Sequence, residues 1–129
     1  MKQFKRYFSL EEARSYLSRL RYEIAEIKRL SRELNVIGFD IYRRKYRVGY
    51  NPDTLHEFPD EFMQIMDIIE DLNREGIIVK GIEEGLVDFP AIRDNGQEVF
   101  LCWKDGEDDI SFWHTVEAGF GGRRSLEEF

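Results

Sequence analysis

Residues 85–124 read GLVDFPAIRDNGQEVFLCWKDGEDDISFWHTVEAGFGGRR, and this stretch decides the fold of the chain. It holds both tryptophans, the single cysteine and one of the two histidines of the 129 residues. Its apolar residues follow the period of a strand rather than that of a helix, and Asn95-Gly96 is the strongest hairpin signal in the chain. The stretch therefore predicts an antiparallel sheet, with one strand on each side of this turn and a further strand over residues 110–116.

The length of this turn sets which side chains can meet across the hairpin. As a two-residue turn it pairs Asp88 with Trp103. Because side chains alternate between the faces of a strand, Cys102 and His114 then share one face as diagonal neighbours. Asp88 falls on the opposite face and could join them only if Pro90 marked a bulge. The predicted register thus separates Asp88 from Cys102 and His114.

Both faces of the predicted sheet are apolar. One face would carry Pro90, Ile92, Val99, Leu101, Trp103 and Trp113, and the other would carry Val87, Phe89, Ala91, Phe100, Cys102, Ile110 and Phe112. Helices can cover one face. The other requires the C-terminal tail, a bound ligand or a second subunit, and we expect a homodimer because the tail is short and rich in glycine.

Two segments upstream have a helical period. Residues 9–35 begin with a capping box, Ser9 and Glu12, and residues 58–75 begin with Pro59 and end before Gly76. Both carry a narrow apolar stripe of the coiled-coil type. The fold class predicted is α+β, in a single domain over residues 1–129: a long antiparallel helical hairpin packed on a small antiparallel β-sheet of three or four strands, with residues 77–129 forming the β-rich half.

Residues 36–57 connect the two predicted helices and are rich in basic and aromatic side chains. The basic residues alternate with tyrosines and are Arg43, Arg44, Lys45 and Arg47 beside Tyr42 and Tyr46. One hypothesis is RNA or nucleotide binding through residues 42–47, with bases stacked on the tyrosines. The alternative is a solvated connector or a short two-stranded excursion.

Composition narrows the classes of function. The net charge of −7 disfavours broad binding to nucleic acids and to anionic membranes, because both are negatively charged. No apolar run approaches the roughly 18–20 residues that span a bilayer. A lone Cys102 cannot form an internal disulfide, so we expect a cytoplasmic protein.

Several side chains of the C-terminal half are candidates for a site. Cys102 and His114 could share a metal ion, although they lack a recognised metal-ligand spacing. Glu107 and His114 could act as an acid–base pair, since histidine titrates near neutral pH. Arg123, with the glycines from Gly119 onward, could hold an anion. The remaining candidates for ligand contact are Asp88, Trp103 and Trp113.

Three segments of the C-terminal half together resemble a known family. They are GLVDFPA (85–91), EVFLCWKDGE (98–107) and ISFWHTVEAGFGGR (110–123), and FSLEEA at the start of the first predicted helix agrees with them. They resemble the bacterial family known as domain of unknown function 2203. The positions that match its pattern are Asp88, Cys102, Trp103, Glu107, Trp113, His114, Gly119 and Arg123. The resemblance implies no particular activity for any of them.

The leading hypothesis is therefore a small cytoplasmic, non-catalytic binding or assembly protein, homodimeric through its sheet or its helices, with a protein or a small anionic ligand as partner. A metal- or anion-dependent enzyme using Cys102, Glu107, His114 and Arg123 is the alternative. RNA or nucleotide binding through residues 42–47 is the third.

Overall fold

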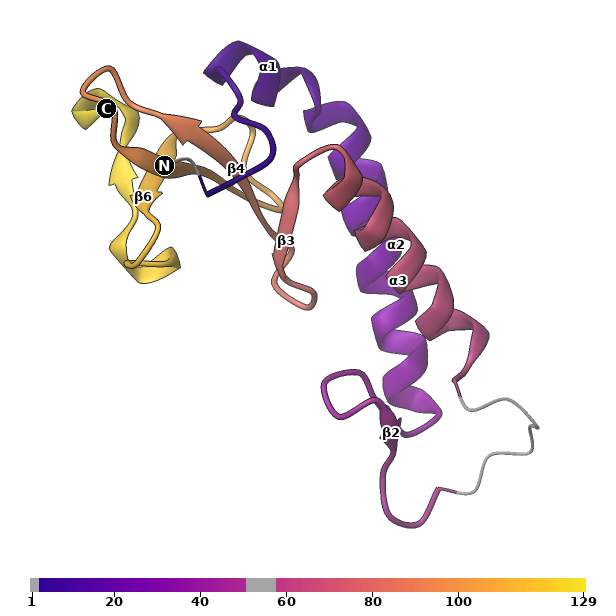
Figure 1. Ribbon diagram of the computed structural model, residues 1–129. Helices are drawn as coiled ribbons and strands as arrows, with labels where there is room; N and C mark the ends of the chain where they lie inside the picture. Colours follow the sequence, from indigo (N-terminus) through magenta and orange to yellow (C-terminus); the bar gives the residue numbers. More distant parts are fainter. Residues whose placement is uncertain (1–2, 51–57) are drawn as a thin grey trace.

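A computed structural model describes residues 3–50 and 58–129 of the chain (Figure 1). In these residues three α-helices accompany a five-stranded antiparallel sheet and a two-stranded one. The elements in chain order are α1 (Leu10–Ser15), α2 (Leu17–Val36), β1 (Phe39–Asp40), β2 (Lys45–Tyr46), α3 (Asp60–Arg74), β3 (Ile78–Gly81), β4 (Leu86–Ile92), β5 (Glu98–Lys104), β6 (Phe112–Thr115), the 3₁₀ turn η1 (Phe120–Gly122), β7 (Arg124–Ser125) and the 3₁₀ turn η2 (Leu126–Glu128). The α+β class predicted from the sequence is confirmed.

The first helical segment starts as predicted but is interrupted. The capping box is present, because the Ser9 hydroxyl accepts from the Glu12 N–H and the Glu12 carboxylate accepts from the Ser9 N–H. The prediction of one continuous helix over residues 9–35 is wrong, because the helix is interrupted at Tyr16. There the chain tightens, and the Tyr16 N–H donates to the Ala13 carbonyl at 3.1 Å. The Tyr16 ring lies 5.9 Å from that of Phe8 and 6.4 Å from that of Phe89, so tertiary packing accompanies the break.

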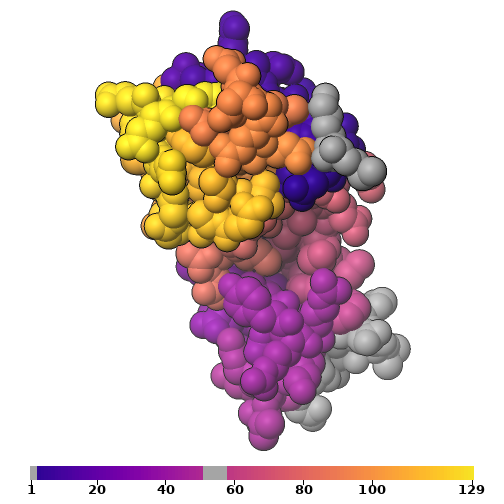
Figure 2. All heavy atoms as spheres, turned by 60° about the vertical axis from the view of Figure 1, so that its left-hand side comes forward, coloured from indigo at the N-terminus to yellow at the C-terminus, as the bar shows by residue number. Residues whose placement is uncertain are grey.

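Helices α2 and α3 pack side by side and form an arm (Figure 1). Gly76 follows α3 with φ +90, as its predicted role beyond the helix end requires. The large sheet lies against one end of this arm, and the other end projects away from the sheet with β1 and β2 (Figures 1 and 2). The expected packing of helices on the sheet is therefore confirmed only for that near end.

The predicted connector contains regular structure. Strands β1 and β2 pair antiparallel, with Phe39 opposite Tyr46, which matches the two-stranded excursion considered from the sequence. The Phe39 ring is buried against the rings of Tyr46 and Phe62, at centroid distances of 5.1 and 5.2 Å, and ties this hairpin to α3. The rest of the predicted connector, residues 51–57, lies outside the described residues.

The large sheet has the order β3-β4-β5-β6-β7, so it contains five strands where three or four were expected. The short β7 pairs with β6 at one edge, and β3 forms the other edge. Strand β4 pairs with β5 through Pro90 without a bulge. On its other side β4 pairs with β3 only as far as Asp88, so no β3 residue lies opposite Pro90. Proline is tolerated at a position that lacks a strand neighbour on one side.

The register of the β4–β5 hairpin differs by one residue from the prediction. Asp88 lies opposite Cys102, where Trp103 was expected, and Ile92 lies opposite Glu98. The cause is the loop, which holds one residue more than the predicted turn: the Arg93 N–H donates to the Gln97 carbonyl, and Gly96 adopts φ +88. A slip of one residue moves the strand's side chains to the other face relative to its partner. The predicted composition of both faces was therefore wrong.

One face of the large sheet packs in the core and the other is covered by the ends of the described chain. Val87, Phe89, Leu101 and Trp103 are buried in the core with the helices. On the outer face, the ring of Phe4 lies 5.1 Å from that of Phe100, and the Arg123 guanidinium lies 4.1 Å from the Phe112 ring centroid. The open apolar face from which the homodimer was inferred is thus covered by the chain itself.

Candidate functional site

Three adjacent strands bring one aspartate, one cysteine and one histidine together on the outer face. Asp88 comes from β4, Cys102 from β5 and His114 from β6. One ligand atom from each lies within 4.8 Å of the others. Exposure is 3% for Asp88, 1% for Cys102 and 3% for His114, so this Asp–Cys–His cluster is buried. The corrected register creates the cluster, because the predicted one left Asp88 on the other face.

The His114 ring is held between two hydrogen-bond acceptors. Its Nδ1 lies 2.8 Å from the Thr115 carbonyl oxygen, and its Nε2 lies 3.1 Å from Asp88 Oδ1. A neutral imidazole has only one N–H and cannot donate to both. Both contacts are satisfied when the ring carries a proton on each nitrogen, whereas a ring that donates only from Nδ1 leaves the Nε2 lone pair facing the carboxylate, where it could bind a cation.

The pKa values of the cluster follow from its burial and its charges. Burial lowers the pKa of His114, but the hydrogen bonds to Asp88 and to the Thr115 carbonyl outweigh it, and the net pKa is raised. Burial, with the nearby Asp88 carboxylate, raises the pKa of Cys102 to about 12. The Cys102 side chain is therefore a thiol at neutral pH, and a thiolate there requires a compensating cation.

A small pocket opens beside the cluster, with a volume of about 220 Å³. Asp88, Cys102 and His114 line it on the sheet side. Its apolar lining comes from Leu86, next to Asp88 on the same face of β4, and from Val116 and Phe120, with Gly119, which has φ +67. Lys80 also lines the pocket and places its Nζ 3.9 Å from Asp88 Oδ2. The register of β3 shifts at Lys80, and such bulges commonly redirect a side chain next to a site.

Arg123 and Glu107 form an ion pair next to the cluster. The Arg123 Nη2 donates to both Glu107 oxygens, at 2.7 and 2.9 Å, and Glu107 Oε1 also accepts from the Lys104 N–H at 2.8 Å. The anion that Arg123 was expected to hold is thus, in this structure, an internal carboxylate. No contact among the described residues joins Glu107 to His114, the two residues expected as an acid–base pair.

The two tryptophans lie on the core face of the sheet, away from the pocket. Both are fully buried. The Trp103 indole donates to the Glu107 carbonyl at 3.0 Å, and the Trp113 indole donates to the Ser125 carbonyl at 3.1 Å. Their hydrogen bonds hold the β5–β6 loop and the C-terminal strand in place. The two tryptophans therefore support the site from the core side and do not line its pocket.

Sequence reasoning named Cys102 and His114 as a pair and Gly119 as part of a separate anion site, but it missed Lys80 and misplaced Asp88. The missed signal for Asp88 was the loop Asp94-Asn95-Gly96, which also fits a three-residue hairpin with glycine at its last position. Lys80 sits in a short strand with a bulge, and no local motif indicates where its side chain points.

The fold and the cluster together define a class: a mixed helix-and-sheet protein with a buried Asp–Cys–His cluster beside a small pocket on one sheet face. Comparison with protein families then identifies one particular family. Residues 6–126 match the family of uncharacterized conserved proteins named DUF2203, and the chain belongs to this family. Comparison with curated proteins and with solved structures gave no match. Within residues 3–50 and 58–129, none of the helices combines the length and the hydrophobicity that a membrane span requires.

Proposed function

We propose that the protein binds one divalent transition-metal ion through Asp88, Cys102 and His114. The observation that carries this proposal is the placement of three different donor atoms, each from its own strand, within 4.8 Å of one another in a buried cluster. Zinc bonds are about 2.0–2.3 Å long, so the ligands of a tetrahedral site lie roughly 3.5 Å apart. Small side-chain movements would bring these donors to that spacing.

The donor set favours zinc over harder ions. A thiolate, an imidazole and a carboxylate together suit zinc and similar transition ions, whereas magnesium and calcium prefer oxygen ligands alone. The second contact of His114 also supports the proposal, because metal-binding histidines usually donate their other N–H to a carbonyl or a carboxylate. Here the Thr115 carbonyl accepts from Nδ1, which leaves Nε2 as the ligand atom.

The proposal also accounts for the charges of the cluster. A divalent ion would replace the proton between His114 Nε2 and Asp88 and the proton on the Cys102 thiol. Three protein ligands would leave one tetrahedral position for a further ligand, and all three of these residues line the pocket. A reduced thiol as ligand agrees with the cytoplasmic location that we infer from the lone cysteine.

The test is metal titration of protein that has been stripped of metal with a chelator and dialysed. We expect one zinc or cobalt ion per chain by mass spectrometry under native conditions, and a thiolate-to-cobalt charge-transfer band in the ultraviolet spectrum. Cys102→Ser should abolish the band, and Asp88→Asn or His114→Gln should weaken binding about 10- to 100-fold or more. Asp94→Asn, in the hairpin loop, is the matched control and should bind as the parent does.

A folded parent protein that binds no ion, or that binds equally after all three substitutions, would refute the proposal. Circular dichroism of each variant separates loss of a ligand from loss of the fold. If Cys102→Ser and His114→Gln stay folded without any change in metal content, the cluster is a buried histidine–aspartate ion pair beside a free thiol.

We infer, as a separate prediction, that the chain acts as a homodimeric binding or assembly protein through its arm. Exposed apolar side chains gather at the end of the arm that carries β1 and β2: Val36 is 77% exposed, Tyr42 65%, and Val48 fully. Such exposed groups favour an interface. The third hypothesis, RNA or nucleotide binding, has less support, because Arg44 lies over the Phe62 ring and Arg47 donates to Asn35, which leaves fewer free cations.

A further inference from the structure

With a divalent ion bound, the described residues around the pocket beside the Asp–Cys–His cluster leave one positive charge unbalanced. With a divalent ion bound, the charges of the Asp88 carboxylate and the Cys102 thiolate cancel those of the ion. Lys80 then adds one positive charge at the pocket wall, because the carboxylate that it approaches at 3.9 Å is engaged by the metal. Arg123 adds nothing to this sum, since Glu107 neutralises it.

The size and the walls of the pocket restrict what could balance that charge. A volume of about 220 Å³ lies below the range of about 300–1,000 Å³ typical of pockets for drug-sized ligands. The apolar side chains that line it beside the cluster are Leu86, Val116 and Phe120. A ligand that fits them has a short apolar body and a single negative group at one end.

We infer that this pocket binds a short-chain monocarboxylate, whose carboxylate contacts Lys80 and fills the open position of the metal while its aliphatic chain packs against Leu86, Val116 and Phe120. The inference deepens the proposed metal-binding function and rests on it for the coordination contact. A carboxylate is preferred to phosphate, because a strongly hydrated dianion would have to be stripped of water against these three apolar walls.

Lys80 is suited to this role by its position. Its Nζ lies 4.6 Å from the Phe100 ring centroid, which holds the ammonium group near the pocket, and the side chain of Lys80 is 45% exposed. A lysine with this exposure can turn from Asp88 to an incoming anion. Its removal should also leave the fold intact, since Lys80 belongs to the edge strand β3.

The experiment measures the binding of formate, acetate, propionate and butyrate by calorimetry, first to zinc-loaded protein and then to protein kept metal-free with a chelator. We expect saturable binding to the loaded form, with affinity rising along the series until the chain exceeds the pocket. Lys80→Met should weaken it about tenfold or more, because hydrogen bonds to charged groups are the strong ones. Lys45→Met, a lysine of β2 on the arm, is the matched control and should change nothing.

The outcomes separate this inference from the proposed metal site. Zinc bound at one per chain without any carboxylate binding would overturn the inference and leave the metal site standing. Equal binding by the parent and Lys80→Met would place the carboxylate elsewhere and would also overturn it. Tighter binding of inorganic phosphate than of every carboxylate would overturn the ligand class. Carboxylate binding that depends on Lys80 in a protein that takes up no zinc would support the pocket and refute the metal.

Discussion

Single residues of the cluster owe their chemistry to what lies around them. A cysteine whose pKa is raised to about 12 is a poor nucleophile at neutral pH, because almost all of it is protonated. Asp88, the partner of His114, also approaches Lys80, so one carboxylate faces a histidine, a lysine and a thiol. This arrangement gives no support to a reactive cysteine, and it agrees with a ligand that becomes a thiolate only when a cation is bound.

The pH dependence of stability tests the state of His114 in metal-free protein. The pKa of His114 is raised above its ordinary value of about 6.5, so its protonated form stabilises the fold. This contribution is fully present below that ordinary pKa and is lost as the pH rises through the raised one. We therefore expect the free energy of unfolding, measured by urea denaturation with chelator present, to fall with increasing pH above about 6.5.

His114→Gln is the control for this prediction, since glutamine keeps a polar group but does not titrate. The difference in unfolding free energy between parent and variant should shrink as the pH rises. Asp88, Cys102 and Lys80 face the same ring, and they are present in both proteins. A difference that stays constant from pH 5.5 to pH 8.5, a span of about three units around the ordinary histidine pKa, would show that folding leaves the pKa of His114 unchanged, and a difference that grows with pH would show that His114 is neutral in the folded protein.

At the scale of elements, the turn between β3 and β4 depends on a glycine. Gly85 has φ +70, and a Cβ at this position would lie 2.7 Å from the Asp105 Cβ and 2.9 Å from Ile24 Cγ2. Gly96, in the β4–β5 loop, has φ +88 but no atom within 4 Å of such a Cβ. Backbone strain therefore applies at both positions, while a steric clash applies at Gly85 alone.

We expect Gly85→Ala to destabilise the protein by about 2–4 kcal/mol, through strain and overpacking together, and Gly96→Ala by about 1 kcal/mol, through strain alone. Urea denaturation of the two variants beside the parent provides the measurement. Equal losses would mean that Ile24 and Asp105 move aside at little cost, and that the contact of the turn with α2 is looser than the structure has it.

Some features of the helices and strands follow from local sequence alone. The capping box at Ser9 and the helix end at Gly76 are local features, and both were predicted. The strands on either side of Asn95-Gly96 were predicted as well, but their register was not, because the same loop sequence is compatible with a two-residue turn and with a three-residue turn. One residue of loop length decided whether Asp88 would reach the cluster.

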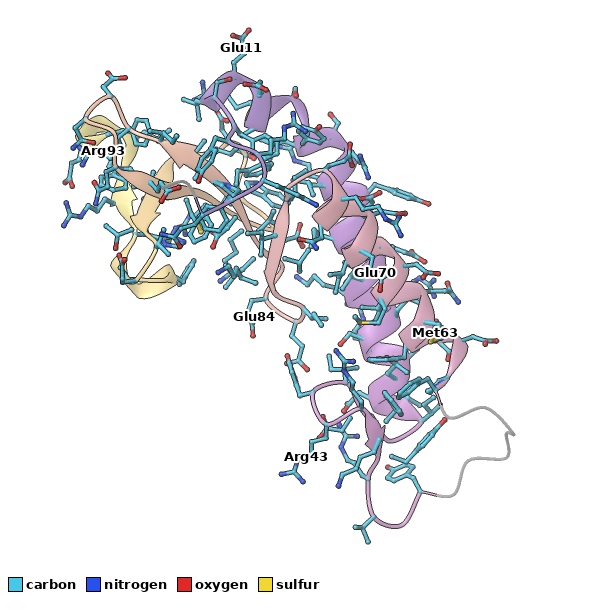
Figure 3. All side chains as sticks on the ribbon, in the orientation of Figure 1. Glu11, Arg43, Met63, Glu70, Glu84 and Arg93 are labelled. Atoms are coloured by element: carbon cyan, nitrogen blue, oxygen red, sulfur yellow. The ribbon has the colours of Figure 1, made fainter. Side chains whose placement is uncertain are left out.

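At the scale of the whole molecule, the chain is elongated, with a sheet lobe at one end and an arm at the other (Figure 2). Arg43 projects from the far end of the arm, and Arg93 lies at the opposite end of the molecule beside the C-terminal segment (Figure 3). The Asp–Cys–His cluster belongs to the sheet lobe, whereas the exposed apolar side chains Val36 and Val48 belong to the arm. Ligand binding and self-association therefore use separate surfaces in our proposals.

The homodimer is tested on the arm by Val36→Glu combined with Val48→Glu. Both side chains are mostly exposed, so the double variant should keep the thermal stability of a single chain, while two pairs of added charges would oppose an interface. Native mass spectrometry of parent and variant should show a dimer converted to a monomer, with metal content unchanged. A monomeric parent, or a dimer that survives the double substitution, would refute an interface at this end of the arm.

The sequence by itself determined the helix boundaries set by caps and glycines, the strands on either side of Asn95-Gly96 and the α+β class, because each of these depends on neighbours along the chain. It also predicted that Cys102 and His114 share a face, since this follows from side-chain alternation in two strands that are consecutive in the sequence. Only the tertiary structure decided the break at Tyr16, the fifth strand, and the meeting of Asp88, Lys80 and His114. Those features depend on hairpin register and on packing between distant segments. The physical reason is that a strand offers two faces of similar polarity here, and a single loop residue selects between them.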